Sequence, residues 1–595
     1  MARPWTPLGR DLFLYPDSCN VYLLRYGTTG IVIDFGTGAW IDHLGEIGVE
    51  RIDHVVLTHI HRDQCCGLYR GRRCDFAVHA PAGEAALLQQ DSLQDFWTGY
   101  QQNGCPANYA APRLPLSDIA CDLRADGETS IGPARFCAIA TPGHTEGALS
   151  YVVEWRGRHL AFCGDAAHAD GTLYQPFHLE WDHWTPTGAL AAWHGLERLG
   201  YCYFDELLPA HGPPIRRRAR QSLKVTQRRL MAFIRAKGSV CAGEKNRWWD
   251  TQMLACGARR VLPNLYQFGA NSYLLLSAKA GALVIDPQLA NNTQLTALMQ
   301  ELGLNDIAVA TATHYHFDHS DALNHVREQY GAAIWLHPWV ALPLADRDRY
   351  DIPWLPTEPI IADRTLPETG VFRFGEYRFQ IRPLPGQTWW HCAFDTSIAG
   401  HQVLFSGDNF QPPTRWNGTG GFCAYNGSRF AEGFARSAQT VIDIAPDIIC
   451  NGHQIIYRFA ASHYRRILRW SEHSERALQA LCPSPDWRAD YDHRALRCEP
   501  FVSKAQAGSQ LKLKLVCHNH AETARVLTGA IAAAASWRVE LARRRVTIPA
   551  GQSRSLTFHV HIPQRAASGR HLIAADCTLD DRLLAEACVA IVDIP

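Results

Sequence analysis

The sequence predicts a mixed α/β (α+β) protein with two tandem copies of one unit and a small β-sandwich after them. Apolar strand-like runs alternate with helical stretches, a short histidine motif occurs twice at an offset of 255 residues, and the last hundred residues favour short alternating strands. We predict domains at residues 1–256 (the first lobe), 257–482 (the second lobe) and 495–595 (the C-terminal sandwich). The segment 482–495, with two prolines, is the predicted linker.

Length and composition restrict the class of protein. A chain of 595 residues is expected to form two to four domains, and 47% hydrophobic residues with 19% charged residues is ordinary for globular proteins. The formal net charge is zero, so no nucleic-acid partner is expected. No apolar run approaches 18 residues and no secretory signal is visible. We therefore expect a cytoplasmic protein with no membrane partner, in which the 19 cysteines are reduced thiols.

The repeated motif is His-x-His-x-Asp, at residues 58–64 and again at 313–319. Each copy follows an apolar run that we expect to be a buried strand. Two histidines two positions apart on an extended backbone point to the same side, so both can reach one metal ion. The aspartate follows where the loop turns, and can face a second metal about 3.5–4 Å away. The motif residues are His59, His61 and Asp63 in the first lobe and His314, His316 and Asp318 in the second.

The motif resembles the metal-binding loop of the metallo-β-lactamase fold superfamily, whose usual form is His-x-His-x-Asp-His. Members include thiolesterases of the glyoxalase II kind, lactonases, nucleases and di-iron oxidoreductases. The resemblance implies that each lobe is a four-layer αββα sandwich with its metals where loops converge at the sheet edge. It also implies that the two lobes pack as an intramolecular pseudo-dimer, imitating homodimers that are common in the family.

Further elements of the family pattern follow in order in the first lobe. Residues 20–36 predict two strands, and Asp34 matches the strand-end aspartate that supports the metal loop from behind; residues 271–288 repeat this with Asp286. By resemblance, His59, His61 and His144 bind one metal, Asp165 bridges, and Asp63 and His211 complete a second position. Gln64 stands where the family carries histidine, and its neutral oxygen suits Mg, Ca or Mn better than Zn. This weakens the second position and favours one metal here.

The second lobe departs from the family on the other side of the metal pair. Asp318, His319, Asp408 and His453 match the second position, and His314 with His316 matches the first. Gln387 replaces the usual histidine of the first position, and His391 substitutes for it only if the turn is remodelled. Each lobe has lost one ligand, which favours divergence after duplication over decay, since a dead copy usually loses several ligands.

Two other features complete the interpretation. His168, close after the bridging aspartate, is a possible supporting or substrate-facing group, although a lone histidine is usually an ordinary polar residue. Residues 510–516, 537–541 and 555–562 alternate apolar and polar positions between turns, which predicts a β-sandwich. This sandwich resembles the Ig-like accessory modules of bacterial enzymes, and its partner is not indicated.

The resemblance implies a hydrolase in which a metal-bound hydroxide attacks a small-molecule ester, thioester or lactone. Asp63 and Asp318 are the candidate catalytic residues, which orient the nucleophile or take its proton. Zinc is the expected cofactor, one or two ions per lobe, with iron or manganese as alternatives. One rival is a non-haem iron oxidoreductase, although no flavin-binding unit is recognisable after residue 482. Another is a single catalytic lobe with a structural partner lobe.

Overall fold

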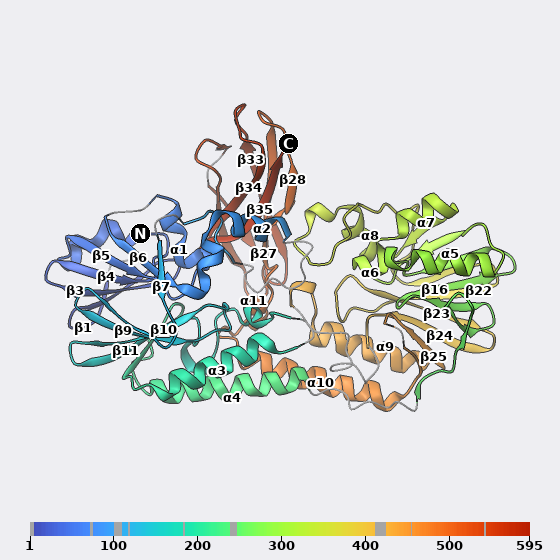
Figure 1. The fold of residues 1–595 in the computed structure, drawn as a ribbon, viewed down its shortest axis with the longest axis horizontal. Coiled ribbons are helices and arrows are strands. Elements are labelled where there is room, and N and C mark those ends of the chain that lie inside the picture. Colours follow the sequence, from blue (N-terminus) through green and yellow to red (C-terminus); the bar gives the residue numbers. More distant parts are fainter. Residues whose placement is uncertain are drawn as a thin grey trace.

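The structure is a computed structural model that describes residues 5–71, 75–99, 110–116, 119–182, 185–238, 247–410, 424–453, 455–540 and 543–595. Two α/β lobes lie on either side of a β-rich body, which stands above the place where the lobes meet (Figure 1). Both lobes combine large sheets with helices, which confirms the predicted mixed α/β class. Within the described residues, every helix is too short or too polar to cross a membrane.

The first lobe contains a seven-stranded and a five-stranded sheet packed face to face. The larger sheet runs in order from β1 to β7, antiparallel as far as β4 and parallel from there on. The smaller sheet runs β12-β11-β10-β9-β8. Side chains of both, including Ile33 and Tyr151, form one apolar core. The strands are β1 (Thr6–Gly9), β2 (Leu12–Pro16), β3 (Asn20–Tyr26), β4 (Thr29–Ile33), β5 (Arg51–Val56), β6 (Ala77–Pro81), β7 (Ile119–Leu123), β8 (Glu128–Ile131), β9 (Ala134–Ala140), β10 (Leu149–Trp155), β11 (Arg158–Gly164) and β12 (Glu206–Pro209).

Helices cover the outer face of each sheet, so the first lobe has four layers. Trp40 of η1 and Leu68 of α1 pack with the larger sheet, and Leu196 of α3 and Leu223 of α4 pack with the smaller one. The helices are η1 (Ala39–Ile47), α1 (Arg62–Tyr69), η2 (Ala82–Leu88), α2 (Gln90–Gly99), η3 (Ala169–Gly171), η4 (Pro176–Leu179), α3 (Thr187–Tyr201) and α4 (Ala219–Gly238).

The second lobe repeats the arrangement with an eight-stranded and a six-stranded sheet. The larger runs in order from β13 to β20 and turns parallel after β17, as the first lobe does after β4. The smaller runs from β21 to β26. The strands are β13 (Gln252–Met253), β14 (Arg259–Leu262), β15 (Leu265–Phe268), β16 (Ser272–Ser277), β17 (Gly281–Ile285), β18 (Val309–Thr311), β19 (Ala333–Leu336), β20 (Arg364–Thr365), β21 (Gly370–Phe374), β22 (Tyr377–Pro383), β23 (Cys392–Ile398), β24 (His401–Gly407), β25 (Ile448–Asn451) and β26 (Ile456–Arg458).

The two lobes share one hydrophobic core, which runs beneath both of their smaller sheets. Leu230 and Phe233 of α4 belong to the same buried cluster as Ile467 and Trp470 of α10, and the Trp470 Nε1 donates a hydrogen bond to the Ala236 oxygen at 2.6 Å. Helices α4 and α10 contact each other and lie along the lower edge of the molecule in Figure 1. The second-lobe helices are η6 (Leu289–Asn291), α5 (Asn292–Glu301), α6 (Phe317–Ser320), α7 (Leu323–Tyr330), α8 (Pro338–Ala345), η7 (Arg347–Arg349), η8 (Ala424–Asn426), the π-helix η9 (Phe430–Ala435), α9 (Arg436–Ile444) and α10 (Ala461–Gln479).

Two sheets facing each other form the C-terminal sandwich. Their orders are β27-β29-β33-β31 and β28-β35-β34-β30-β32, and Phe558 and Ala590 belong to the core between them. The predicted linker is not a loop alone, because it contains α11 (Trp487–Tyr491) with Tyr491 buried. The strands are β27 (Leu496–Glu499), β28 (Val502–Lys504), β29 (Gln510–His518), β30 (Arg525–Ala532), β31 (Arg538–Glu540), β32 (Arg544–Ile548), β33 (Ser553–His561), β34 (Gly569–Leu579) and β35 (Arg582–Ile594).

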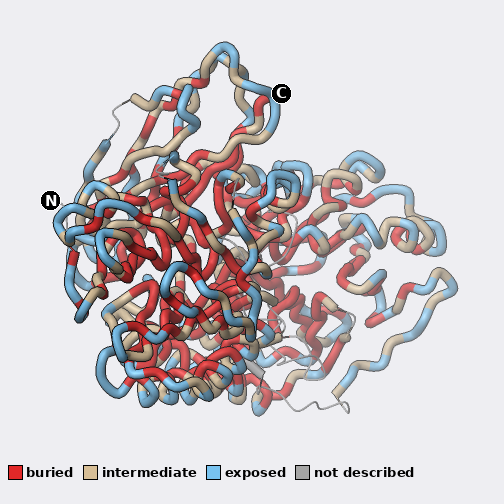
Figure 2. Tube along the Cα trace, turned by 60° about the vertical axis from the view of Figure 1, so that its left-hand side comes forward, coloured by how far each residue is buried: buried red, intermediate tan, exposed pale blue. Residues whose placement is uncertain are grey.

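A buried carboxylate fixes the C-terminal sandwich to the first lobe. Glu586 of β35 lies 2.7 Å from Arg70 and 3.2 Å from Arg113, and Tyr69 donates a hydrogen bond to it at 2.6 Å. Burial raises the pKa of Glu586, but the two guanidinium groups outweigh this effect and lower it overall. Buried segments crowd the middle of the molecule (Figure 2), so these parts pack as one body.

We predict that Glu586→Gln lowers the free energy of unfolding by about 3 to 5 kcal/mol at pH 7, because removing one partner leaves buried charges uncompensated. Since the folded pKa is depressed, the stabilisation is present above the unfolded pKa of roughly 4.3 and is lost as pH falls through the folded value. The difference between wild type and variant, measured by urea unfolding, should therefore shrink below about pH 4.

The matched control is Glu540→Gln, which changes an exposed carboxylate of the same sandwich that pairs with His561. It should leave the unfolding curve nearly unchanged. Equal effects of the two substitutions would contradict the anchoring role of Glu586.

Candidate metal centres

A buried aspartate at a strand end holds each metal loop in place. Asp34 follows β4 and accepts hydrogen bonds from the Thr58 N–H at 2.8 Å and from the Thr58 hydroxyl at 2.9 Å. Asp286 follows β17 and accepts the same pair from Thr313, at 2.6 and 2.8 Å. Both aspartates have positive φ, 58° and 56°, which aspartate tolerates better than most residues. Burial raises the pKa of Asp34 to about 7. The histidines that follow each threonine are thereby oriented.

Three histidines of the first lobe converge on one point. His59, His61 and His144 are buried, and one ring nitrogen from each lies within 4.8 Å of the others. Among the described residues, the Nε2 atoms of His59 and His61 have no hydrogen-bond partner. Burial is the largest cause that lowers the pKa of all three imidazoles. Neutral, unpartnered nitrogens that face one another fit a metal ion, which requires deprotonated ligands.

His211 lies close to Asp165 and Asp63, the other residues predicted for the second position of the first lobe. The His211 Nδ1 lies 2.9 Å from Asp165, and its Nε2 lies 3.2 Å from Asp63. Burial lowers the pKa of His211, but the charge of Asp165 outweighs it and the pKa rises well above its usual value. The His211 ring therefore lies between the carboxylates of Asp165 and Asp63. Gln64 of α1 is fully buried, and its side-chain amide has no hydrogen-bond partner among the described residues.

Two aromatic residues near this centre carry no recognisable signal in the sequence. The His178 ring lies 4.5 Å from those of both His61 and His144, centroid to centroid. Tyr174 stacks on His211 with centroids 3.7 Å apart. Both come after Asp165 in the chain, Tyr174 just before η4 and His178 within it, where no family motif marks them. His168 lies further back, where its Nδ1 is 2.9 Å from the Thr172 hydroxyl.

In the second lobe the structure brings together a different set of ligands. His314, His319 and Asp408 offer atoms within 4.8 Å of one another, and so do Asp318, His319 and His453. The His319 Nε2 lies 3.1 Å from Asp408, and the His453 Nε2 lies 3.0 Å from it. Burial lowers the pKa of His319, but Asp408 and Asp318 outweigh burial and raise it well above the usual range. The His314 Nε2 has no hydrogen-bond partner among the described residues. This set of nitrogen and oxygen donors also fits a metal.

His316 belongs to neither of these two groups, and its ring bonds to Asn426 instead. Its Nε2 lies 3.0 Å from the Asn426 side-chain oxygen, which also accepts a hydrogen bond from Tyr315. Gln387 donates from its Nε2 to Asp408 at 2.9 Å. His391 is buried and stacks on His314 with centroids 4.8 Å apart, outside the two ligand groups. The predicted ligation by His316 stays a prediction, and no group formed by the described residues includes His391.

The chain is similar in sequence to known proteins over parts of its length. The chain is 28% identical over 148 residues to hydroxyacylglutathione hydrolase GloC of Haemophilus influenzae, a match that covers 24% of this chain and 66% of that protein. It is 26% identical over 212 residues to a probable metallo-hydrolase of Methanocaldococcus jannaschii, covering 33% and 89%. A solved beta-lactamase from Chitinophaga pinensis is 22% identical, covers 36% of this chain and 91% of its own, and superposes with a TM-score of 0.29.

The family model described as the metallo-beta-lactamase superfamily matches the chain twice, over residues 14–214 and 265–453. These ranges contain every predicted ligand. The predicted class of enzyme, a metallo-hydrolase of this superfamily, is confirmed with it. On these matches, which span more than half of its residues, the chain belongs to the metallo-beta-lactamase superfamily.

Proposed function

We propose that the protein is a metal-dependent hydrolase of ester, thioester or lactone substrates. The observation that carries this proposal is the convergence of three buried, neutral imidazoles, those of His59, His61 and His144, beside a cavity that His61 and Asp63 line. A zinc ion held there would supply Lewis-acid activation of water and of the substrate carbonyl. The name of the Haemophilus influenzae relative, a hydroxyacylglutathione hydrolase, favours an acyl substrate.

Asp63 is placed to move a proton. Its carboxylate lines the cavity and lies 3.2 Å from the His211 Nε2, a contact that holds the carboxylate in place to take a proton from water. Asp318 occupies the matching place in the second lobe, 3.7 Å from the His453 Nε2. We propose that Asp63 is the catalytic base of the first lobe and Asp318 its counterpart.

The two lobes are proposed to hold diverged metal positions. In the first lobe the three-histidine set, together with Gln64 where the family carries histidine, favours one zinc ion. In the second lobe the mixed set around Asp408 accepts zinc, iron or manganese. Two family matches and two matching pairs of sheets support tandem duplication. The shared core of α4 and α10 supports an intramolecular pseudo-dimer.

The remaining assignments also stay proposals. Two facing sheets of short strands are the basis for an Ig-like C-terminal domain at residues 495–595, after lobes at 1–256 and 257–482. The described cysteines are free thiols, as expected in the reducing cytoplasm.

We predict that elemental analysis finds about one metal equivalent less in His59→Ala/His61→Ala than in wild type, and one less in His314→Ala/His319→Ala. His401→Ala is the control, because this histidine of the same lobe pairs with Asp447 outside the ligand groups, and it should keep the second-lobe metal. A first-lobe variant with unchanged metal would rule out the three-histidine site. Iron in place of zinc would move the proposal to oxidoreductase chemistry.

We further predict that the zinc-loaded protein hydrolyses activated esters or thioesters, and that Asp63→Asn lowers kcat about 10²- to 10⁴-fold with its metal content unchanged. Asp122→Asn, an exposed carboxylate of the same lobe that pairs with His79, is the control and should keep full activity. Full activity of Asp63→Asn would remove its catalytic role.

A further inference from the structure

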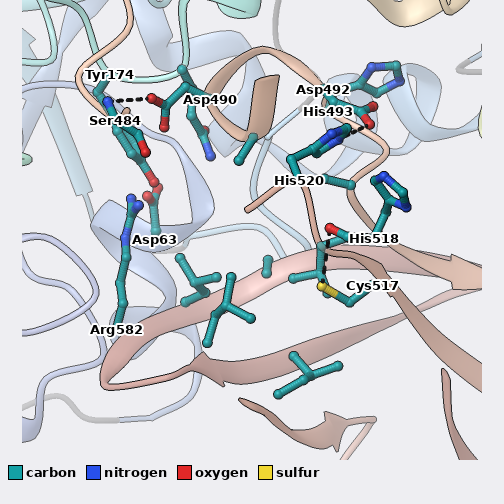
Figure 3. A pocket seen from close by; sticks show the side chains of 18 of the residues that line it. Asp63, Tyr174, Ser484, Asp490, Asp492, His493, Cys517, His518, His520 and Arg582 are labelled. Carbon is teal, nitrogen blue, oxygen red and sulfur yellow. Dashed lines mark hydrogen bonds and ion pairs between the residues drawn. The ribbon is translucent and has the colours of Figure 1, made fainter. Parts of the chain in front are cut away.

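One cavity joins three parts of the chain that are distant in sequence. It has a volume of about 200 Å³ and lies between the first lobe, the segment around α11 and the C-terminal sandwich (Figure 3). The first lobe contributes His61, Asp63 and Tyr174 to its wall. The sandwich contributes Arg582, the first residue of β35. A group that the sandwich supplies therefore shares a space with candidate metal-site residues.

The Arg582 side chain is placed by stacking. Its guanidinium carbon lies 5.2 Å from the ring centroid of Tyr174, which in turn stacks on His211 at 3.7 Å. Arg582 extends from the sandwich toward Asp63 and Tyr174 (Figure 3). Although protein surrounds it, the side chain stays accessible to solvent, because it lines the cavity. Contact with Tyr174, by ring stacking and a side-chain hydrogen bond, orients the planar fork and uses only part of its five N–H donors.

Arg582 differs from neighbouring arginines in its ion pairs. Among the described residues, no carboxylate lies within 4.0 Å of it, whereas Arg525 of the same cavity wall is bonded to Asp486 at 2.6 Å. Arg70 and Arg113 are both paired with Glu586. A guanidinium that is exposed to a small cavity and lacks a carboxylate partner is a ready site for an anion.

The acidic groups of the cavity are already engaged. Asp63 lies 3.2 Å from the His211 Nε2, and Asp492 lies 2.8 Å from the His520 Nε2. Asp490 accepts a hydrogen bond from the Ser484 N–H at 2.8 Å, and burial raises its pKa to about 6. Their charge is partly compensated, so they oppose an incoming anion less than free carboxylates would.

We propose that Arg582 binds a carboxylate on the substrate, so that the C-terminal sandwich completes the first-lobe site and selects short acyl substrates that end in an anion. This inference rests on the proposed hydrolytic function of that site. The apolar residues Phe177, Leu527 and Leu584 line the space between and suit a short aliphatic body. Arg582 is thus a specificity-determining residue, and the metal ligands of the first lobe are unaffected by its loss.

The binding test compares succinate with butyrate, which differ by the second carboxylate, using isothermal titration calorimetry on the metal-loaded protein. Wild type should bind succinate at least about tenfold more tightly, and Arg582→Gln should remove this preference, since a bond to a charged group is lost. Arg582→Lys, which keeps the charge and loses the fork, should fall between. Arg525→Gln, which lines the same cavity but is ion-paired in wild type, should keep the preference.

The kinetic test uses 4-nitrophenyl butyrate and 4-nitrophenyl hydrogen succinate. Arg582→Gln should lower kcat/KM about tenfold or more for the anionic ester, mainly through KM, and less than about twofold for the neutral one. Metal content and circular dichroism should match wild type.

The two tests distinguish failure of the Arg582 anion site from failure of the proposed hydrolase function. Ester hydrolysis with no dependence on Arg582, or no preference for succinate in wild type, would overturn the role of Arg582 and leave the hydrolase standing. An Arg582-dependent preference for succinate in a protein that cleaves neither ester would support the anion site and overturn the hydrolase.

Discussion

Both metal centres depend on a buried carboxylate that follows a central strand. Asp34 and Asp286 each satisfy the N–H and the hydroxyl of the threonine that opens the metal loop. Without this acceptor two buried donors would be left unpaired, at a cost of about 1 to 3 kcal/mol each. The loop backbone would then be free to change direction, and the histidines that follow would no longer converge. The geometry of each candidate ligand set therefore depends on an aspartate, Asp34 or Asp286, that is not itself one of the ligands.

The two buried aspartates that follow β11 and β24, Asp165 and Asp408, differ in their hydrogen-bond partners. In the first lobe the His211 Nδ1 lies 2.9 Å from Asp165, and in the second the amide of Gln387 donates to Asp408. In each lobe a neighbouring side chain thus places a nitrogen within hydrogen-bonding distance of the aspartate. A buried carboxylate needs such a partner, because uncompensated charge is costly in the interior. Gln387 thus bonds to Asp408, whereas the Gln64 amide has no hydrogen-bond partner among the described residues, so the surroundings of the two glutamines differ.

Much of this arrangement could be predicted from the sequence, because its signals are local. The strands at residues 20–36 and 271–288, their terminal aspartates and the set His59, His61 and His144 lie in motifs with fixed order. The residues that prediction missed act over long distances. Asn426 holds His316 from 110 residues away, and α11 fills what was expected to be a plain linker. Tyr174 and Arg582 meet only because the C-terminal sandwich packs on the first lobe, and no periodicity in either segment indicates that contact.

The contact between the first lobe and β35 has a consequence in time. The Arg62 side chain bonds to the backbone oxygen of Glu586 across 524 residues of chain. At a synthesis rate of roughly 5 to 20 residues per second, the loop that carries the first histidines waits about 25 to 100 s for the strand that covers it. During this interval Arg70 and Arg113 have no carboxylate from β35, and the apolar side chains of α2 that will pack on the sandwich are exposed. The first candidate metal loop is thus synthesised early but gains its contact with β35 only after that strand has been made. A chain that stops before β35 lacks this contact.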